Sequence, residues 1–376
     1  MKIITILGVR PQIIRLNVII KKLDQLLGQN HVLVNTGQNF DPKLNDIFIY
    51  ELGVRNPNYH LGIRASNQFE QIGKMMMGLN EVFEKENPDA IFILGDTNTD
   101  LAAAVTARHF RKNNQKGIQI FHMEAGNRAF DQRVPEETNR KIVDHISTIN
   151  MVYTHRSKEH LYHEGLRNTF VVGNPMKEVM MYHQLRIENS RILDSLKIEK
   201  SKYMLITLHR SENVDCADNL ALIISALEEI FAKYKLPIIF STHPRAKDKM
   251  MAHKIEVQNK NSDIRFIEPV GFLDFVKLQK EAKLVASDSG TVPEESTILG
   301  VPNIILRETT ERTELLDHGC SILAGASNKA RIIKAFDITF NKSIDWSIPA
   351  EYQVSDVSNR VINIILSHIS NYYGGI

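Results

Sequence analysis

Short runs of apolar, often β-branched residues alternate along the chain with longer amphipathic segments. In the first half, the apolar runs predict strands at Lys2–Leu7, His31–Asn35, Ala90–Leu94, Ile118–His122 and Asn150–Thr154. The amphipathic segments between these runs predict helices at Pro11–Leu26, Asn67–Glu86 and Thr99–Lys112. This alternation is typical of stacked βαβ units, in which crossover helices cover a parallel sheet.

A second series of the same kind follows a polar stretch at 186–202, which we interpret as a linker. The first series ends in "FVVGNP", residues 170–175, as a strand that stops at Gly-Asn-Pro. The second series predicts strands at 203–209, 236–243, 264–268, 283–290 and 301–306. The last apolar pattern, Ser358–Tyr372, predicts a long helix.

These two series predict an α/β protein with two doubly wound, Rossmann-like domains that face each other across a cleft. We place the first domain at 1–172 together with a C-terminal helix at 355–376, and the second domain at 173–354. The length of 376 residues fits this division, because a single hydrophobic core stops growing well below such a length.

Composition and charge exclude several classes of function. The 46 basic and 44 acidic residues are interspersed, whereas a nucleic-acid-binding protein would show a basic patch or tail. Cys216 and Cys320 are far apart and outside any metal or redox spacing, which indicates a reducing compartment without disulfides. The first apolar run stops at Leu7, too early for a signal peptide, and no stretch is long enough to span a membrane. We therefore expect a soluble, cytoplasmic protein.

Polar side chains follow the predicted strands at the points where the strands end. In open α/β sheets, ligands bind beyond the carboxyl ends of the strands, so such side chains are candidate site residues. The six positions found in this way are Arg10, Gln38, Asp96, Glu124, His209 and Ser289.

The segment "SDSGTVPEES", residues 287–296, predicts an anion site. A strand ends, Ser-Gly-Thr makes a tight corner, and a helix begins near Val292 or Pro293. Free backbone N–H groups and the helix dipole at this corner attract an anion, and Glu295 would lie one turn further, near a sugar. An ordinary helix cap with an acidic first turn has the same pattern. The two arginines of "LRETTERTE", 306–314, favour a phosphate ligand.

A second charged segment is "HMEAGNRAFDQRVPEETNRKIVDH", residues 122–145, in which Pro135 marks the start of a helix. Glu136 and Arg140 fall four residues apart on one helix face, and we interpret Glu137 as a solvated residue of a salt-bridged helix. Glu124 follows a buried strand and is expected to point into the cleft. Carboxylates held near arginines can differ in pKa, as proton transfer at carbon requires.

The chain resembles a known family in nine collinear motifs that span nearly its whole length. These motifs are "GVRPQIIRL", "GQNFD", "LGDTNT", "HMEAGNR", "VPEETNRKIVDH", "VVGNP", "LHRSEN", "SDSGTVPEES" and "RETTER". Together they resemble the non-hydrolysing UDP-N-acetylglucosamine 2-epimerase family. The resemblance implies a GT-B-like fold, in which the first domain holds the sugar and the catalytic acids and the second binds UDP. It also implies that C2 of a UDP-2-acetamido sugar is inverted by anti elimination of UDP, which gives a 2-acetamido glycal, followed by re-addition of UDP.

The resemblance assigns roles to individual residues. Asp96, Glu124 and Glu136 match the acids that remove and return the C2 proton, and His209 matches the histidine that assists the departing diphosphate. The candidate substrate-binding residues are Arg10, Arg15, Gln38, Arg140, Arg210, Ser289, Gly290, Thr291, Glu295 and Arg312. Of these, Arg10, Ser289 and Gly290 match phosphate ligands, and Glu295 matches the carboxylate on the ribose. The resemblance implies a homodimer, with a UDP-sugar and UDP as ligands, no metal and no redox cofactor. His160 and His163 are expected to be solvated.

Several positions depart from the common pattern of the family. The usual Thr, Glu and Lys of the first motif are Val9, Gln12 and Arg15, and a commoner leucine is Asn127. Gln38 keeps one of two activator-binding glutamines, while the other position is Asp41.

The loop at 125–134 is shorter than in the UDP-N-acetylglucosamine enzymes, and we expect it to face the sugar together with Gln12 and Asn127. These features resemble the capsule and O-antigen branch, which makes UDP-N-acetyl-L-fucosamine from UDP-N-acetyl-L-talosamine.

Four alternatives stay open at this point. The chain could interconvert UDP-N-acetylglucosamine and UDP-N-acetylmannosamine, or it could be a hydrolysing epimerase that releases free sugar and UDP. A GT-B glycosyltransferase would share the fold and the segment Ser289–Glu295 but would not need Asp96, Glu124 and Glu136 together. A UDP-sugar-binding regulator without activity would lose those carboxylates.

Overall fold

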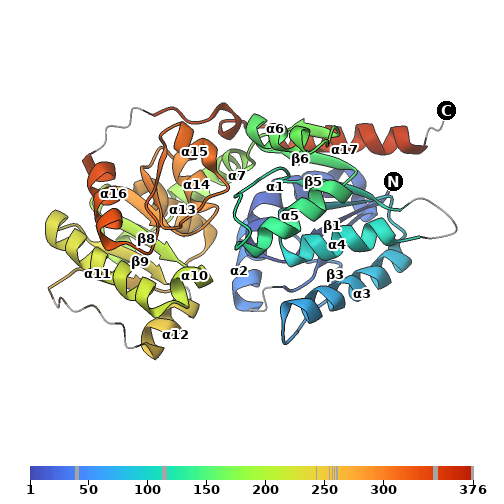
Figure 1. Cartoon of the computed structure of the whole chain (residues 1–376). Coiled ribbons are helices and arrows are strands. Elements are labelled where there is room, and N and C mark those ends of the chain that lie inside the picture. The colour runs from blue at the N-terminus through green and yellow to red at the C-terminus, as the bar shows by residue number, and fades with distance from the viewer. Residues whose placement is uncertain are drawn as a thin grey trace. The chain divides into compact units, whose positions relative to one another are not determined.

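The computed structural model describes residues 1–38, 42–111, 117–242, 244–253, 255, 257, 259, 261–341 and 346–373. Asp41 and Lys112, which the sequence analysis names, and residue 243, at which it ends a predicted strand, lie outside these ranges. The chain divides into two compact units, Met1–Tyr182 with Glu351–Ile376, and His183–Ala350 (Figure 1). The sequence analysis predicts that the first domain ends at 172 and resumes at 355, whereas the first unit ends at Tyr182 and resumes at Glu351.

The first unit contains a parallel sheet with the strand order β3-β2-β1-β4-β5-β6-β7. The strands are β1 (Ile3–Leu7), β2 (His31–Asn35), β3 (Tyr59–His60), β4 (Ala90–Leu94), β5 (Gln119–Met123), β6 (Ile149–Val152) and β7 (Thr169–Val171). Every residue of β1, β2, β4, β5 and β6 is buried, as expected for strands covered on both faces. The predictions for β2 and β4 are confirmed at both ends, and those for β1, β5 and β6 to within two residues.

Helices flank this sheet and pack on it through apolar side chains (Figure 1). The helices of the first unit are α1 (Arg10–Leu27), α2 (Pro42–Leu52), α3 (Gln68–Glu86), α4 (Asn98–His109), α5 (Pro135–Ile146), α6 (His155–His163), α7 (Met176–Tyr182) and α17 (Val357–Tyr373). On one face, Ile6 and Ile93 pack with Leu79 of α3 and Ala103 of α4. The long C-terminal helix, α17, contacts α1, so the chain returns to the first unit after it completes the second.

Glycine is required at the corner between β1 and α1. A Cβ atom on Gly8 would lie 2.0 Å from Oγ1 of Thr99 and 2.8 Å from Oγ1 of Thr36. Since no side chain can occupy that space, the single glycine of this corner allows β1 to approach the start of α4.

The second unit repeats the architecture with the parallel strand order β10-β9-β8-β11-β12-β13. Its strands are β8 (Met204–Leu208), β9 (Ile238–Thr242), β10 (Ile264–Ile267), β11 (Leu284–Ser287), β12 (Asn303–Ile305) and β13 (Ser321–Leu323). Its helices are α8 (Gln184–Glu188), α9 (Ile192–Leu196), α10 (Ser211–Val214), α11 (Ala217–Tyr234), α12 (Pro244–Ala252), α13 (Phe272–Glu281), α14 (Val292–Ile298), α15 (Thr313–Asp317) and α16 (Lys329–Asn341).

Two predictions of local structure are wrong. The stretch at 186–202 is not a linker, because it contains α9, and Leu193, Leu196 and Ile198 pack into the core of the second unit. The few apolar residues of this helix stand among many charged ones, so the sequence pattern does not indicate an apolar face. The helix predicted to end at Lys112 ends at His109 instead, because Phe110 takes an extended backbone and buries its ring against Phe83.

Candidate active site

Asp96 and Glu124 follow two neighbouring strands of the first sheet. The strands β4 and β5 pair up to Leu94 and Met123, and the backbone N–H of Gly95 donates to the carbonyl of Met123 at 3.0 Å. A Cβ atom on Gly95 would lie only 3.8 Å from Oε2 of Glu124. The carboxylate of Glu124 therefore lies beside the backbone that leads to Asp96.

Glu124 has a left-handed backbone, with φ at 67°, and a buried arginine holds its side chain. The guanidinium of Arg15 pairs with Oε2 of Glu124 and lies 5.5 Å from the ring centroid of Tyr153. The hydroxyl of Tyr153 donates to the same carboxylate oxygen at 3.4 Å. A left-handed backbone costs about 1 kcal/mol outside glycine, and these contacts offset that cost. Arg15, expected to bind substrate, here contacts a candidate acid.

Asp96 is held by Arg140 of helix α5. The guanidinium donates to Oδ2 of Asp96 from Nε at 3.1 Å and from Nη2 at 2.6 Å. Its Nη1 donates to Oε2 of Glu137 at 3.0 Å. Glu137 is only 1% exposed and also accepts the backbone N–H of Ala129, so its interpretation as a solvated residue is wrong. Within the helix Arg140 pairs with Glu137, and Glu136 is half-buried in the first turn.

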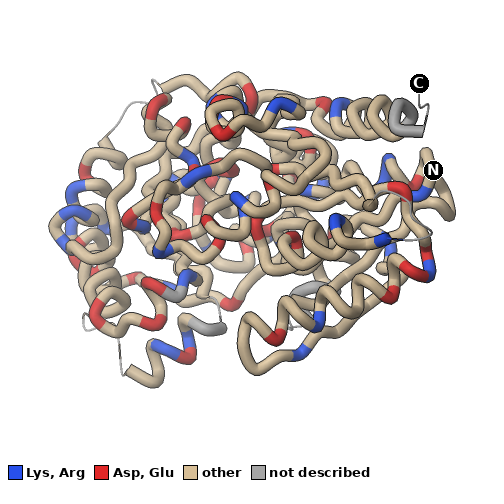
Figure 2. The backbone as a smooth tube through the Cα atoms, turned by 45° about the vertical axis from the view of Figure 1, so that its right-hand side comes forward, with Lys and Arg blue, Asp and Glu red and all other residues tan. Residues whose placement is uncertain are grey.

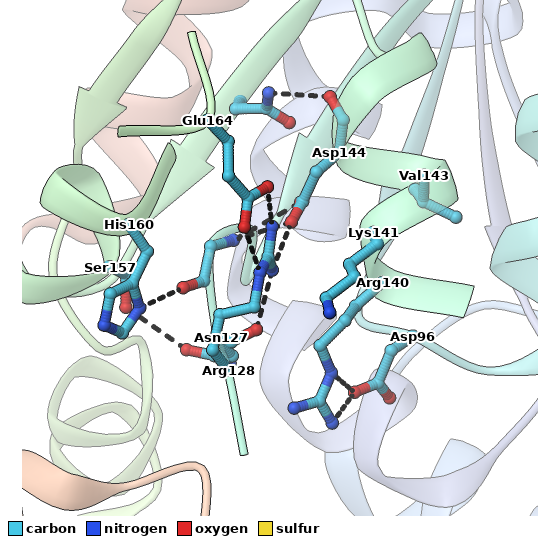
Figure 3. A network of polar contacts seen from close by, with 12 residues as sticks. Asp96, Asn127, Arg128, Arg140, Lys141, Val143, Asp144, Ser157, His160 and Glu164 are labelled. Carbon is cyan, nitrogen blue, oxygen red and sulfur yellow. Dashed lines mark hydrogen bonds and ion pairs between the residues drawn. The ribbon is translucent and has the colours of Figure 1, made fainter. Parts of the chain in front are cut away.

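A buried network fixes the loop that carries Glu124. Figure 3 shows Arg128 between Asp144 of α5 and Glu164, which follows α6. Nη1 of Arg128 donates to Asp144 at 2.7 Å, while its Nε and Nη2 donate to the two oxygens of Glu164 at 2.8 and 2.6 Å. Asp144 also accepts the backbone N–H of Gly126 at 3.2 Å. The loop is therefore attached to both helices.

His122 of β5 extends this network to the end of β4. Its Nε2 donates to the carbonyl of Gly95 at 2.8 Å, and its Nδ1 lies 3.1 Å from Oδ1 of Asp144. Burial lowers the pKa of His122, but the hydrogen bond and the charge of Asp144 outweigh it and raise this pKa. Burial opposes ionisation of Asp144, yet His122 and Arg128 hold its pKa below the usual value. The sequence analysis did not single out His122 or Asp144, although both lie in the segment it quotes.

Gln12 and Asn127 do not face a sugar in the way the sequence analysis expects. Oε1 of Gln12 accepts the backbone N–H groups of Gly8 and Val9, and its Nε2 donates to the carbonyl of Leu94 and to Asp100. Asn127 is buried, and its Oδ1 accepts from the hydroxyl of Ser157 on α6. Gln12 thus braces the corner between β1 and α1, and Asn127 ties the loop to α6.

The remaining candidates of the first unit lie at the predicted strand ends. Oε1 of Gln38 accepts from the N–H and the hydroxyl of Thr99, so Gln38 caps α4. The guanidinium of Arg10 lies 5.8 Å from the ring centroid of Phe48.

Two histidines of α6, His160 and His163, differ in their surroundings. Nδ1 of His160 contacts the carbonyl of Gly126 at 2.9 Å, and its ring packs edge to face on Phe130. Its interpretation as solvated is therefore wrong, whereas His163 is exposed as expected.

In the second unit, the corners after β8 and β11 lie side by side. Thr207 pairs with Ser287 in the sheet, so His209 and Arg210 lie near Asp288 and Ser289. The hydroxyl of Ser289 accepts the backbone N–H of Thr291 at 3.2 Å, and α14 begins at Val292, as predicted.

Gly290 is packed closely by charged side chains. A Cβ atom on it would lie 2.7 Å from Oε1 of Glu311 and 3.7 Å from Nη2 of Arg210. Glu311 in turn accepts from Arg307 at 2.9 Å. The corner Ser289–Thr291 therefore lies against guanidinium groups, one of which, Arg307, is among the two arginines of 306–314 that favour a phosphate ligand in the sequence analysis.

Two further candidates have buried partners within the second unit. Glu295 accepts from Nε2 of Gln279 at 2.7 Å, and Arg312 pairs with Glu294 of α14. Both side chains therefore hold α14 in place.

Within the described part of the chain, no group of three or more His, Cys, Asp or Glu side chains could hold a metal ion. None of the described helices combines the length and the apolarity that crossing a membrane requires. Figure 2 shows basic and acidic residues interspersed over both units.

Comparison with known proteins identifies the family. The family model described as UDP-N-acetylglucosamine 2-epimerase matches residues 21–366. The chain belongs to the UDP-N-acetylglucosamine 2-epimerase family. A family relative from Methanocaldococcus jannaschii, a UDP-N-acetylglucosamine 2-epimerase, is 40% identical over 93% of this chain and 95% of its own length. The predicted enzyme class, a non-hydrolysing 2-epimerase of UDP-N-acetyl sugars, is confirmed.

Other members of the family extend the comparison. The UDP-2,3-diacetamido-2,3-dideoxy-D-glucuronate 2-epimerase of Pseudomonas aeruginosa is 33% identical over 92% of this chain and 94% of its own length. A crystal structure of the M. jannaschii enzyme in complex with UDP-GlcNAc and UDP matches with a TM-score of 0.89, at 38% identity over 98% of this chain and 100% of that chain. The predicted GT-B-like fold class with two Rossmann-like domains is confirmed.

Proposed function

We propose that this protein inverts C2 of a UDP-2-acetamido sugar by anti elimination and re-addition of UDP through a 2-acetamido glycal. The observation that carries this proposal is the pair of carboxylates at adjacent strand ends, Asp96 and Glu124, each held by a buried arginine. A glycosyltransferase or a binding protein has no need of two such carboxylates together.

The first step breaks two bonds. One acid takes the proton from C2, the electron pair of that C–H bond forms the C1=C2 double bond, and the C1–O bond breaks as UDP leaves. The second step returns UDP to C1 and a proton to the opposite face of C2. Because the proton leaves from one face and returns to the other, the reaction needs acid–base groups on both faces. Asp96, Glu124 and Glu136 are the residues we assign to this task.

Arginines and backbone amides stabilise the charge of the released diphosphate in this proposal. We assign the diphosphate to Arg10, Arg210 and the corner Ser289–Thr291, since charge-assisted hydrogen bonds to phosphate are strong and geometrically specific. His209 donates a proton to the departing oxygen, and Glu295 accepts from the ribose. Gln38 and Arg312 are assigned an indirect role toward the same ligand, because Gln38 caps α4 and Arg312 holds α14 in place.

Arg15 and Arg140 act on the substrate through the acids they contact. Their buried guanidiniums favour the ionised forms of Glu124 and Asp96. This matters because a carboxyl group must be ionised before it can accept a proton as a general base.

Two sugars are candidates. The relatives named UDP-N-acetylglucosamine 2-epimerase favour UDP-N-acetylglucosamine and its C2 epimer. The motifs "GQNFD", "EAGNR", "VPEE" and "SGTV" favour interconversion of UDP-N-acetyl-L-talosamine and UDP-N-acetyl-L-fucosamine for a capsular or O-antigen polysaccharide. The loop at 125–134, Gln12 and Asn127 were the three features expected to face the sugar. Gln12 and Asn127 instead bond to other residues of the first unit, so they no longer support the L-sugars.

The experiment is an incubation of the protein with each UDP-sugar in heavy water, followed by NMR. We expect deuterium at C2 of the epimer and, after long incubation, free UDP and glycal. Product without deuterium would contradict elimination, and free sugar formed together with UDP would indicate a hydrolase. A homodimer and a cytoplasmic location stay predictions, the first of which sedimentation velocity tests.

A further inference from the structure

Asp288 is a buried carboxylate that the assignments above do not use. It follows β11 and is fully buried, and it accepts hydrogen bonds from the corner after β8. The backbone N–H groups of His209 and Arg210 each donate to it at 3.0 Å, and Nδ2 of Asn213 donates at 3.1 Å. Burial opposes ionisation of Asp288, but the charge of His209 and these donors hold its pKa below the usual value.

The carboxylate also contacts the ring of His209. Its Oδ1 lies 3.1 Å from Nδ1 of the imidazole, and the side chain of His209 is 37% exposed whereas that of Asp288 is 0% exposed. A neutral imidazole carries one N–H, and the hydrogen bond made by one ring nitrogen decides which nitrogen that is. With Nδ1–H directed at a carboxylate, Nε2 is the nitrogen that exchanges a proton with a ligand.

We propose that Asp288 is a positioning residue that fixes the tautomer and the orientation of His209, so that Nε2 meets the departing diphosphate. This inference rests on the proposed function for the diphosphate. As the C1–O bond breaks, imidazolium His209 gives its Nε2 proton to the leaving oxygen, and it takes that proton back when UDP adds again. Throughout this exchange the carboxylate of Asp288 faces Nδ1 of the ring and holds its orientation.

The substitution Asp288→Asn separates this role from a purely structural one. The asparagine Oδ1 still accepts the backbone N–H groups of His209 and Arg210, which preserves the corner. Its Nδ2 donates where the carboxylate accepted, so Nδ1 of His209 must become an acceptor and the proton moves to Nε2. In a serine protease triad, the equivalent change leaves the geometry intact and lowers kcat about 10⁴-fold.

Long-range ¹H–¹⁵N spectra of histidine-labelled protein read the tautomer directly, with His209→Gln to assign the ring signals. At a pH at which the imidazole is neutral, we expect the Nδ1–H form in the wild type and the Nε2–H form in D288N. We further expect kcat of D288N to fall at least ~100-fold, with the Kd for UDP within twofold. The matched control is Asn213→Ala, which removes another partner of Asp288 but not the ring contact. It should keep the Nδ1–H tautomer and keep kcat within threefold.

An Nε2–H tautomer in the wild type would overturn the inference even if D288N did not fold. An unchanged tautomer or an unchanged kcat in D288N would do the same. If the wild type exchanged no deuterium at C2, the proposed function would fail, whereas the tautomer would still report on the pair Asp288–His209.

Discussion

The guanidinium of Arg140 donates two hydrogen bonds to one oxygen of Asp96 and a third to Glu137. The side chain of Arg140 is 5% exposed and that of Asp96 is 29% exposed, so the pair is largely shielded from water. Arg140 and its neighbour Asn139, whose Nδ2 donates to the carbonyl of Asp96 at 3.0 Å, attach helix α5 to the end of β4. The position of Asp96 therefore depends on a residue 44 positions later in the sequence.

Replacing Arg140 by lysine should lower kcat at least about tenfold, which corresponds to about 1.4 kcal/mol of transition-state stabilisation. A lysine ammonium cannot contact Asp96 and Glu137 in the planar fork of a guanidinium. Steady-state kinetics and calorimetric titration with UDP measure the effect, and the affinity for UDP should not change. The control is Lys141→Gln, an exposed neighbour whose amine is 3.8 Å from Glu137, and it should retain full activity. Wild-type kcat in R140K would show that Arg140 does not position Asp96.

The neighbours Glu136 and Glu137 should separate catalysis from stability. Glu136→Gln should lose at least ~100-fold in kcat, the usual scale for a general acid or base, at unchanged melting temperature. Glu137→Gln leaves buried Arg140 with a weaker partner and should destabilise the protein by about 3 kcal/mol. Thermal unfolding and turnover of both variants test this. A large loss of stability in E136Q would favour a structural role for Glu136.

Asp96→Asn and Glu124→Gln should also lose at least ~100-fold in kcat, because an amide cannot accept the C2 proton. Both variants should still bind UDP, which calorimetric titration measures. Loss of UDP binding together with thermal stability would instead indicate that these carboxylates hold the loop.

The buried carboxyl of Asp100 should make stability fall with rising pH. Burial raises its pKa from 3.8 to about 7, against the hydrogen bonds from Thr97. Between these values the native state holds a proton that the unfolded chain has released, so the free energy of unfolding decreases as pH rises and levels off above about pH 7.

Denaturant unfolding of the wild type and of Asp100→Asn at pH 5 and pH 8 tests this prediction. Relative to D100N, the wild type should lose about 3 kcal/mol between the two pH values, from about 1.4 kcal/mol per pKa unit. Asp194→Asn changes an exposed carboxylate on α9 and should show the same difference from the wild type at both pH values. A pH-independent difference for D100N would show that Asp100 is ionised throughout.

The sugar preference is tested by measuring both UDP-sugar pairs side by side without added activator. If the motif resemblance is the better guide, the L-sugar pair should react at least ~10-fold more efficiently, because mismatched polar partners reduce specificity. Equal or better turnover of UDP-N-acetylglucosamine would assign this protein the activity for which its M. jannaschii relative is named.

Much of the fold follows from local pattern. The buried strands β2 and β4 were predicted to the residue, because a fully covered parallel strand is a short apolar run with polar ends. The start of α5 at Pro135 was also local, since proline suits the first turn of a helix. The short helix α9 was missed because its few apolar residues stand among charged ones.

The sequence by itself determined which side chains stand at the strand ends, because a parallel sheet places the residues after each strand along one edge. It could not determine their partners. Only the tertiary structure brought Arg15 to Glu124, Arg140 to Asp96 and Asp288 to His209, pairs that lie 109, 44 and 79 residues apart. Spacing along a helix or strand predicts contacts within a few residues, whereas burial of charge depends on which distant groups share the same desolvated space. That is why Gln12, expected to face a sugar, instead braces the corner of β1 and α1.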